Sequence, residues 1–329
     1  MPRTLHAEHD RFPLKAPFRI ARGAKTAADV VTVTIADGGA RGWGEAVPYP
    51  RYGESVESVL AQIEGARALI ERGTDRAALQ DALPAGAARN ALDCALWDLE
   101  ARLTGRSVAE TIGGETPGPI ATALTISIDT PMAMAAAAAA VSNAPLLKVK
   151  VDAEAPAARI RAVREAAPAP MLIVDPNESW DRALVEAMQD ALAEAEVALL
   201  EQPVPAGEDC WLEGFTPAVP ICADESVHVA ADLPAVARRY QAVNVKLDKA
   251  GGLTEALEVA RTARAMGLGL MTGCMISSSL SIAPALHLAA ISDFADLDGP
   301  LWLAADRPGG VRGEAGILQP PAPGFWGTP

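Results

Sequence analysis

The sequence predicts an α/β protein whose centre is a barrel of eight parallel strands wrapped by helices. Four short apolar runs, each closed by one ionisable residue, recur 22 to 26 residues apart. That spacing is the length of one strand, one helix and two short connections. Continuous apolar runs are typical of strands buried on both faces, as in a parallel sheet covered by helices. The number of such strands favours a closed barrel over an open sheet.

Eight segments are expected to form the strands of this barrel. Four of them are the apolar runs that close on Asp175, Glu201, Asp224 and Lys246. The other four are 120–127, 146–151, 268–273 and 294–298. Segments rich in Ala, Glu and Arg with helical periodicity lie between the strands and predict the outer helices. The clearest of these helical segments are 153–166, 182–194 and 253–266.

Lys148 and Lys150 stand two residues apart in a strand otherwise built of Leu and Val. Side chains two apart in a strand share a face, so both ammonium groups project from one side. Their mutual repulsion and burial are expected to depress a lysine pKa toward the range of a base. The alternative is a half-exposed edge strand with solvated lysines. The charges that close the following strands favour a functional pair.

Asp175, Glu201 and Asp224 close three successive strands. The carboxyl ends of barrel strands meet at one mouth, so these carboxylates are expected to converge and repel one another. A divalent cation relieves that repulsion, and oxygen ligands without His or Cys favour Mg²⁺, or Mn²⁺, over Zn²⁺. A lone Asp at a strand end more often caps the next helix. Three in succession predict one metal site.

Lys150 and Lys246 lie on strands that flank the three carboxylate strands, so they are expected on opposite sides of the mouth. Two opposed bases suit a 1,1-proton transfer. One removes a proton from a carbon next to a metal-bound carboxylate, and the other returns it to the opposite face. Lys148 and the metal would stabilise the enolate formed between these two steps.

These residues together resemble the enolase superfamily, muconate-lactonizing subgroup. The likeness is carried by Lys148-Val149-Lys150, by the three carboxylates and by Lys246 in the run Asn-Val-Lys-Leu-Asp-Lys-Ala-Gly-Gly, and it runs along nearly the whole chain. Lys or His bases with Mg²⁺ at an ene-diolate are a property of that superfamily. The resemblance implies a (β/α)7β barrel at 113–300, an α+β capping domain at 1–112 and a C-terminal segment at 301–329 that returns to the cap.

Within the expected cap, strands are predicted at 30–36 and 43–47, and helices near 55–71 and 87–104. Two further segments are irregular, cationic and marked by Gly or Pro. They are 18–23 and 48–53. Such segments are expected to be loops that close over the mouth of the barrel.

Asp296 and Asp298 stand two residues apart on the last predicted strand, hence on one face at the same mouth. Anions beside three carboxylates suggest a ligand with a positive group, whereas the alternative is an Asp pair that caps a turn. An Asp-x-Asp at this place resembles the dipeptide epimerases of the superfamily. There it holds the free α-ammonium of an L-amino acid joined to the epimerised residue.

The two expected loops are similar to those of epimerases that act on L-Ala-D/L-Glu in murein peptide recycling. The resemblance implies that an arginine of the first loop answers the distal carboxylate of the glutamate. Arg22 is the candidate for this role, with Arg51 as the alternative. Thr125 and Met275 are expected to line the pocket, together with small polar residues of 273–279.

Composition limits the partners. A chain of 329 residues with 21% charged residues fits one barrel plus a cap, and its net charge of −14 argues against nucleic acid. Its first 14 residues lack an apolar signal core, and the apolar run 132–141 is too short to span a bilayer. The four cysteines show neither metal spacing nor a disulfide pattern. We therefore expect a cytoplasmic enzyme for a small dipeptide, without a membrane partner and with a possible homo-oligomer.

Three alternatives remain open at this point. A related racemase or lyase, such as an N-acylamino acid racemase, o-succinylbenzoate synthase or muconate cycloisomerase, would share the metal and the lysines but would not need Asp296 and Asp298. An epimerase of a different dipeptide would keep both aspartates. A non-enzymatic or Schiff-base protein could also use the same barrel, and borohydride trapping would detect a Schiff base.

Overall fold

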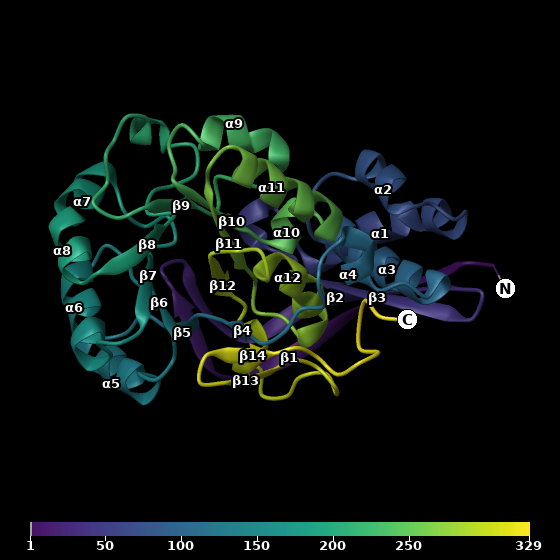
Figure 1. Ribbon diagram of the computed structural model, residues 1–329, viewed down its shortest axis with the longest axis horizontal. Helices are drawn as coiled ribbons and strands as arrows, with labels where there is room; N and C mark the ends of the chain where they lie inside the picture. Colours follow the sequence, from purple (N-terminus) through teal and green to yellow (C-terminus); the bar gives the residue numbers. More distant parts are fainter. Residues whose placement is uncertain (1) are drawn as a thin grey trace.

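The computed structural model describes residues 2–329 and confirms the barrel of eight parallel strands with a separate α+β cap (Figure 1). Neighbouring strands of the barrel follow one another along the chain. They are β5 (Leu124–Ile126), β6 (Leu146–Lys150), β7 (Met171–Asp175), β8 (Val197–Glu201), β9 (Ile221–Ala223), β10 (Ala242–Val245), β11 (Gly269–Gly273) and β12 (Phe294–Asp296). Ala123 N donates a hydrogen bond of 2.8 Å to Ala295 O, which joins the last strand to the first.

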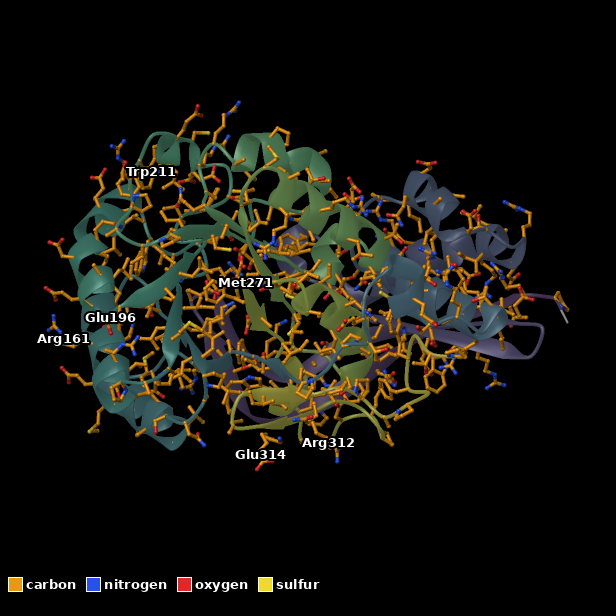
Figure 2. All side chains as sticks on the ribbon, in the orientation of Figure 1. Arg161, Glu196, Trp211, Met271, Arg312 and Glu314 are labelled. Atoms are coloured by element: carbon orange, nitrogen blue, oxygen red, sulfur yellow. The ribbon has the colours of Figure 1, made fainter. Side chains whose placement is uncertain are left out.

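The period of two explains the interior of the barrel. In β6, Leu147 and Val149 pack toward the helices, whereas Leu146 packs inside the barrel with residues such as Met271. Lys148 and Lys150 share the face of Leu146, so this strand carries its two cations into the barrel. Met271 lies amid the barrel strands in Figure 2, while Arg161 and Glu196 lie at the outer edge.

Helices cover the outside of the barrel. They are α5 (Pro131–Ala140), α6 (Pro156–Ala166), α7 (Arg182–Ala187), α8 (Gln189–Glu194), α9 (Leu233–Val236), α10 (Leu247–Ala250), α11 (Leu253–Ala265) and α12 (Ser279–Ala289), with short 3₁₀ turns η2 (Cys210–Leu212), η3 (Ala230–Asp232) and η4 (Gly299–Trp302). The helix expected at 182–194 is divided at Met188. A 3₁₀ turn, and no long helix, follows β12, as the resemblance implied.

The cap consists of an antiparallel sheet covered by helices. Its elements are β1 (Thr4–Ile20), β2 (Gly23–Asp37), β3 (Ala40–Ala46), η1 (Pro50–Tyr52), α1 (Val56–Glu71), α2 (Arg76–Ala82), α3 (Ala87–Thr104) and α4 (Val108–Ile112). Two glycines let α3 approach β3 closely. A Cβ at Gly44 would lie 2.0 Å from Ala91 O, and one at Gly42 would lie 2.1 Å from Ala95 O. Larger residues at either position would push the helix off the sheet.

The segment 18–23 is not the irregular loop that the sequence predicts. It is the end of a long β-hairpin, in which Phe18 pairs with Lys25 and Ile20 pairs with Gly23 around a turn at 21–22. The pairing register shifts between Pro13 and Phe18. Proline interrupts the hydrogen-bond ladder there, which hides the strand in the sequence. The second expected loop, 48–53, does contain only a single 3₁₀ turn.

The C-terminal segment crosses the barrel and ends beside the cap (Figure 1, yellow). Its strands β13 (Arg312–Glu314) and β14 (Ile317–Gln319) form a small sheet with β4 (Ile120–Ala121), so the strand expected at 120–127 is divided between two sheets. Trp326 Nε1 donates to Trp43 O at 2.9 Å. The limits 1–112, 113–300 and 301–329 stay predictions for the domains.

Side chains of α3 fix the cap on the barrel. Arg89 Nη2 donates to Ala250 O at 2.7 Å, and Asn90 Nδ2 donates to Asp248 Oδ1 at 2.8 Å. These buried bonds hold the cap above the carboxyl ends of the strands. Within residues 2–329 we find no helix with the length and apolar character needed to cross a bilayer.

Candidate active site

A cavity of about 500 Å³ lies between the cap and the carboxyl ends of the barrel strands. Both units contribute to its walls. The residues predicted from the sequence that line it are Arg22, Arg51, Thr125, Lys148, Lys150, Lys246, Met275, Asp296 and Asp298. Asp175, Glu201 and Asp224 are not among its lining residues, and they lie buried beneath the lysines.

The two lysines of β6 are both buried and both paired with carboxylates. Lys150 Nζ lies 2.5 Å from Asp175 Oδ2. Lys148 Nζ lies 2.7 Å from Glu201 Oε2, 2.8 Å from Asp296 Oδ2 and 3.1 Å from Asp175 Oδ2. The half-exposed edge strand considered as an alternative is therefore wrong.

The expected depression of a lysine pKa is wrong for Lys148. Burial acts to lower the pKa of Lys148, but the charges of Asp296, Glu201 and Asp175 outweigh it and hold that pKa well above its usual range. Burial is likewise outweighed at Lys246, where Asp224 raises the pKa. Sequence reasoning counted the neighbouring cation and the burial but not the anions that the fold brings to each ammonium.

Asp175 and Glu201 end β7 and β8, and Asp224 directly follows β9, as predicted. Asp224 accepts from two lysines, with Oδ2 2.7 Å from Lys246 Nζ and Oδ1 2.6 Å from Lys249 Nζ. Lysine ammonium groups thus lie between the carboxylates. Accordingly, residues 2–329 hold no group of three acidic, imidazole or thiol side chains already arranged around one point.

The donor set nevertheless fits a hard divalent cation. All three carboxylates are buried, and Glu201 Oε2 makes no hydrogen bond, since it faces Lys148 outside hydrogen-bonding geometry. Burial and the charge of Asp175 raise the pKa of Glu201 to about 7. A buried, mutually repelling set of oxygen ligands is the environment that Mg²⁺ stabilises. Lysine cations supply part of that positive charge here.

Asp296 and Asp298 both face the cavity, but they do not share a strand. β12 ends at Asp296, and Asp298 directly precedes η4 as its N-cap residue. Asp298 Oδ2 accepts from Thr125 N at 2.8 Å and from Trp302 Nε1 at 3.1 Å, bonds that fix it against β5 and η4 but cap no turn. Asp296 Oδ1 is buried and has no hydrogen-bond partner within residues 2–329. A free buried carboxylate oxygen suits a cationic ligand.

Arg22 reaches the cavity from the hairpin turn but is already paired. Its Nη2 lies 2.8 Å from Glu225 Oε1 and its Nη1 lies 3.0 Å from Glu178 Oε2. Arg51 Nε is 2.7 Å from the same Glu178 oxygen. Sequence reasoning could not find these ion pairs, because their partners lie more than a hundred residues away along the chain.

Lys25 is a cavity residue that sequence reasoning missed. It stands opposite Phe18 in the hairpin and lines the cavity with Nζ 5.0 Å from the centre of the Tyr49 ring. Unlike Arg22 and Arg51, it forms no ion pair within the described part of the chain. Its signal in the sequence was a second cation shortly after Arg22, which carried weight only once the hairpin was known.

The stretch 273–279 contributes less to the cavity than expected. Cys274, Met275 and Ile276 line it. Ser278 N instead donates to Glu45 Oε1 at 2.8 Å, and Ser279 N donates to Asp306 Oδ1 at 3.0 Å. These two serines therefore join the barrel to the cap and to the C-terminal segment.

Comparison with known proteins agrees with this geometry. Residues 132–325 match the model of the enolase C-terminal domain-like family, and residues 3–113 match the mandelate racemase / muconate lactonizing enzyme N-terminal domain. An L-Ala-D/L-Glu epimerase of Escherichia coli is 51% identical over 92% of this chain and 95% of its own. An N-acetyl-D-glutamate racemase of Pseudoalteromonas is 46% identical over 91% and 95%.

Two solved structures extend the comparison. An enolase family member from Agrobacterium tumefaciens, with homology to dipeptide epimerases and with bound sodium and L-Ala-L-Glu, matches with a TM-score of 0.97, 48% identity and coverage of 99% of this chain and 100% of its own. A dipeptide epimerase of Enterococcus faecalis in complex with Mg and L-Leu-L-Tyr matches with a TM-score of 0.89, 31% identity and 98% coverage of both chains. The chain belongs to the mandelate racemase / muconate lactonizing enzyme family of the enolase superfamily.

Proposed function

We propose that this dipeptide epimerase inverts the α-carbon of the second residue of L-Ala-D/L-Glu. The observation that carries the proposal is the free, buried Oδ1 of Asp296, which faces the same cavity as Lys150 and Lys246. An anion at that place suits the α-ammonium of a dipeptide. The relatives that act on dipeptides support this reading.

Lys150 and Lys246 are the proposed bases, since they enter the cavity from β6 and from the end of β10, on either side of the carboxylate strands. One neutral amine takes the α-proton, and the opposite ammonium returns a proton to the other face. By family resemblance Lys150 serves the L configuration and Lys246 the D configuration. Lys148 stabilises the charge that develops on the substrate carboxylate.

Asp175, Glu201 and Asp224 would hold one divalent cation, for which we propose Mg²⁺, with Mn²⁺ as a substitute. When bound, such a cation supplies positive charge to the oxygens of the substrate carboxylate. The bound Mg or sodium in related structures supports a cation at this place.

For the distal carboxylate of glutamate we propose Lys25 first and Arg22 second. Arg22 would have to leave Glu178 or Glu225 to bind a substrate anion, whereas Lys25 already faces the cavity without a carboxylate partner in residues 2–329. Thr125 and Met275 line the same cavity. The proposed setting is the cytoplasm, where murein peptides would be recycled.

A second candidate is a racemase of N-acylated glutamate, which the 46% identity to an N-acetyl-D-glutamate racemase favours. The two candidates differ in the charge that meets Asp296. An ammonium can donate to the free Oδ1 of this carboxylate, whereas an acylated nitrogen leaves that oxygen without the charged donor, since Lys148 pairs with Oδ2 only.

The deciding experiment measures α-proton exchange in D₂O by mass spectrometry with Ala-Glu, acetyl-Ala-Glu and acetyl-Glu. Losing one charge-assisted hydrogen bond to Asp296 Oδ1 costs about 1.5 to 3 kcal/mol, or roughly one to two orders of magnitude in kcat/KM. Ala-Glu should therefore exceed both acetylated compounds by that margin. Faster exchange of acetyl-Glu would assign the protein to the second candidate. Asp296→Asn should reduce the ratio of kcat/KM between Ala-Glu and the acetylated compounds. Asp190→Asn, at an exposed aspartate of a helix, is the matched control and should leave this ratio unchanged.

A further inference from the structure

We propose that Glu178 is a positioning residue that holds two separate cap segments closed over the cavity. One segment is the hairpin turn that carries Arg22, and the other is the 3₁₀ turn η1 that carries Arg51. The kinetic part of this inference rests on the proposed function, whereas its structural part does not.

Glu178 is a single barrel carboxylate shared by both cap arginines. Its Oε2 accepts from Arg22 Nη1 at 3.0 Å and from Arg51 Nε at 2.7 Å, while its Oε1 accepts from Arg51 Nη2 at 2.8 Å. Within residues 2–329 no other carboxylate pairs with both arginines. Two parallel bonds to one guanidinium are both strong and directional, so the pairing with Arg51 fixes the orientation of η1.

Burial strengthens this contact. The Glu178 side chain is 7% exposed, although both arginines reach solvent. Ala206 N also donates to Glu178 Oε1 at 2.8 Å, which ties the carboxylate to the loop after β8. An anion held in this way by the barrel is a fixed anchor for the cap rather than a solvated surface charge.

The backbone around Glu178 supports a dedicated role. Asn177 and Glu178 both have positive φ values, 47° and 66°, although neither is glycine. Such strain persists where the surroundings impose it. Here Asn177 N donates to Asp175 Oδ1 at 2.8 Å, and Glu178 N donates to Gln202 O at 2.9 Å.

The strained pair has a geometric consequence. The short segment from Asp175 to Glu178 begins beneath the cavity, where Asp175 pairs with Lys150, and ends at the cap, where Glu178 pairs with the two arginines. Asn177 O also accepts from Arg22 Nη1 at 3.1 Å. The loop that follows the proposed cation ligand Asp175 therefore also anchors the two cap segments that cover the cavity. Closure of the cap is in this way linked to the position of Asp175.

The first test uses the substrate-free protein and hydrogen–deuterium exchange with mass spectrometry. Glu178→Gln removes the charge and keeps the shape of the side chain. Arg51→Gln breaks only the contact between Arg51 and Glu178, and it does so at the more exposed partner, where misfolding is not a concern. A hydrogen bond to a charged group contributes about 1.5 to 3 kcal/mol, so both variants should speed exchange in peptide 48–53 by about tenfold or more. Glu178→Gln also weakens the bond to Arg22, so it alone should speed exchange in peptide 18–25 by a similar factor. Exchange in peptide 146–151 of the barrel should not change.

Glu208→Gln is the matched control, because Glu208 is exposed on the same side of the barrel and its side chain makes no hydrogen bond or ion pair within residues 2–329. The double variant Glu178→Gln/Arg51→Gln should open the cap no further than Glu178→Gln alone, since the contact that Arg51→Gln removes is already lost there. Unchanged exchange at 48–53 in both single variants, or at 18–25 in Glu178→Gln, would overturn the inference, whatever the substrate is.

The second test is kinetic and uses Ala-Glu. Because Glu178 touches neither Lys150 nor Lys246, opening the cap should raise KM about tenfold and leave kcat within about twofold. A loss of kcat at unchanged KM, without faster exchange, would refute a positioning role. Faster cap exchange in variants of an enzyme that does not turn over Ala-Glu would contradict the proposed function and leave the role of Glu178 supported.

Discussion

His287 should make the protein sensitive to mild acid. Its side chain is buried on α12 beside Trp326, with the ring centres 6.0 Å apart, and its Nδ1 has no hydrogen-bond partner within residues 2–329. Burial lowers the pKa of His287 to about 4. In the unfolded chain the imidazole has its ordinary value of about 6.5. At pH values between these two pKa values, His287 is protonated in the unfolded chain and neutral in the folded protein.

The sign of the effect follows from proton linkage. Since the unfolded state binds more protons, the free energy of unfolding rises with pH in this window. The contribution of His287 is fully present above pH 6.5 and is lost as the pH falls toward 4. Its whole size is about 3 kcal/mol, of which about 2 kcal/mol is lost between pH 7 and pH 5.

Urea unfolding of the wild type and of His287→Leu, at pH 7 and pH 5, measures this contribution. Carboxylates whose pKa is raised by burial, such as Asp93 at about 6 and Asp248 at about 7, act in the opposite direction but equally in both proteins. The wild type should therefore lose about 2 kcal/mol more than the variant over this pH step. Equal losses, or an imidazole proton resonance of His287 that titrates near pH 6.5, would refute the reasoning.

The remaining predictions concern the reaction. Exhaustive chelation with EDTA should abolish α-proton exchange and Mg²⁺ should restore it, because Asp175, Glu201 and Asp224 fit one hard cation; full activity after chelation would remove the metal assignment. Lys246→Ala should stop epimerisation yet leave exchange of the α-proton of the L epimer. Lys148→Ala should slow exchange of both the L and the D epimer. Exchange of both epimers in the Lys246 variant would contradict two opposed bases. Lys25→Ala should raise KM for Ala-Glu at least tenfold, as expected for one lost charge-assisted contact of about 1.5 to 3 kcal/mol, and should do so more than for Ala-Leu. An equal rise for both dipeptides would assign Lys25 a structural role.

The barrel was predictable because its strands are buried on both faces and leave continuous apolar runs, such as the one that ends at Asp175. The hairpin around Arg22 was not, because its strands are partly exposed and broken by Pro13 and Pro17. A strand without a buried face has no clear period of two, so its residues read as a loop.

The candidate site divides in the same way. Residues at strand ends, such as Glu201 and Lys246, could be placed together from sequence because barrel strands all end at one mouth. Partners brought in by the cap could not be placed, and the pairing of Arg22 with Glu225 is an example. The raised pKa of Lys148 was missed for the same reason, since its cause is anions from three other strands.

The contact of Trp326 with Trp43 has a consequence for biosynthesis. The cap lies at the start of the chain, yet one of its buried contacts comes from a residue that the ribosome adds almost three hundred positions later. Gly327 N also donates to Asp98 Oδ1 of the cap at 2.7 Å. Domains usually fold as they emerge during synthesis. The cap of this protein can therefore complete these contacts only after the whole barrel has been translated, so its N-terminal unit is unfinished for most of the time of synthesis.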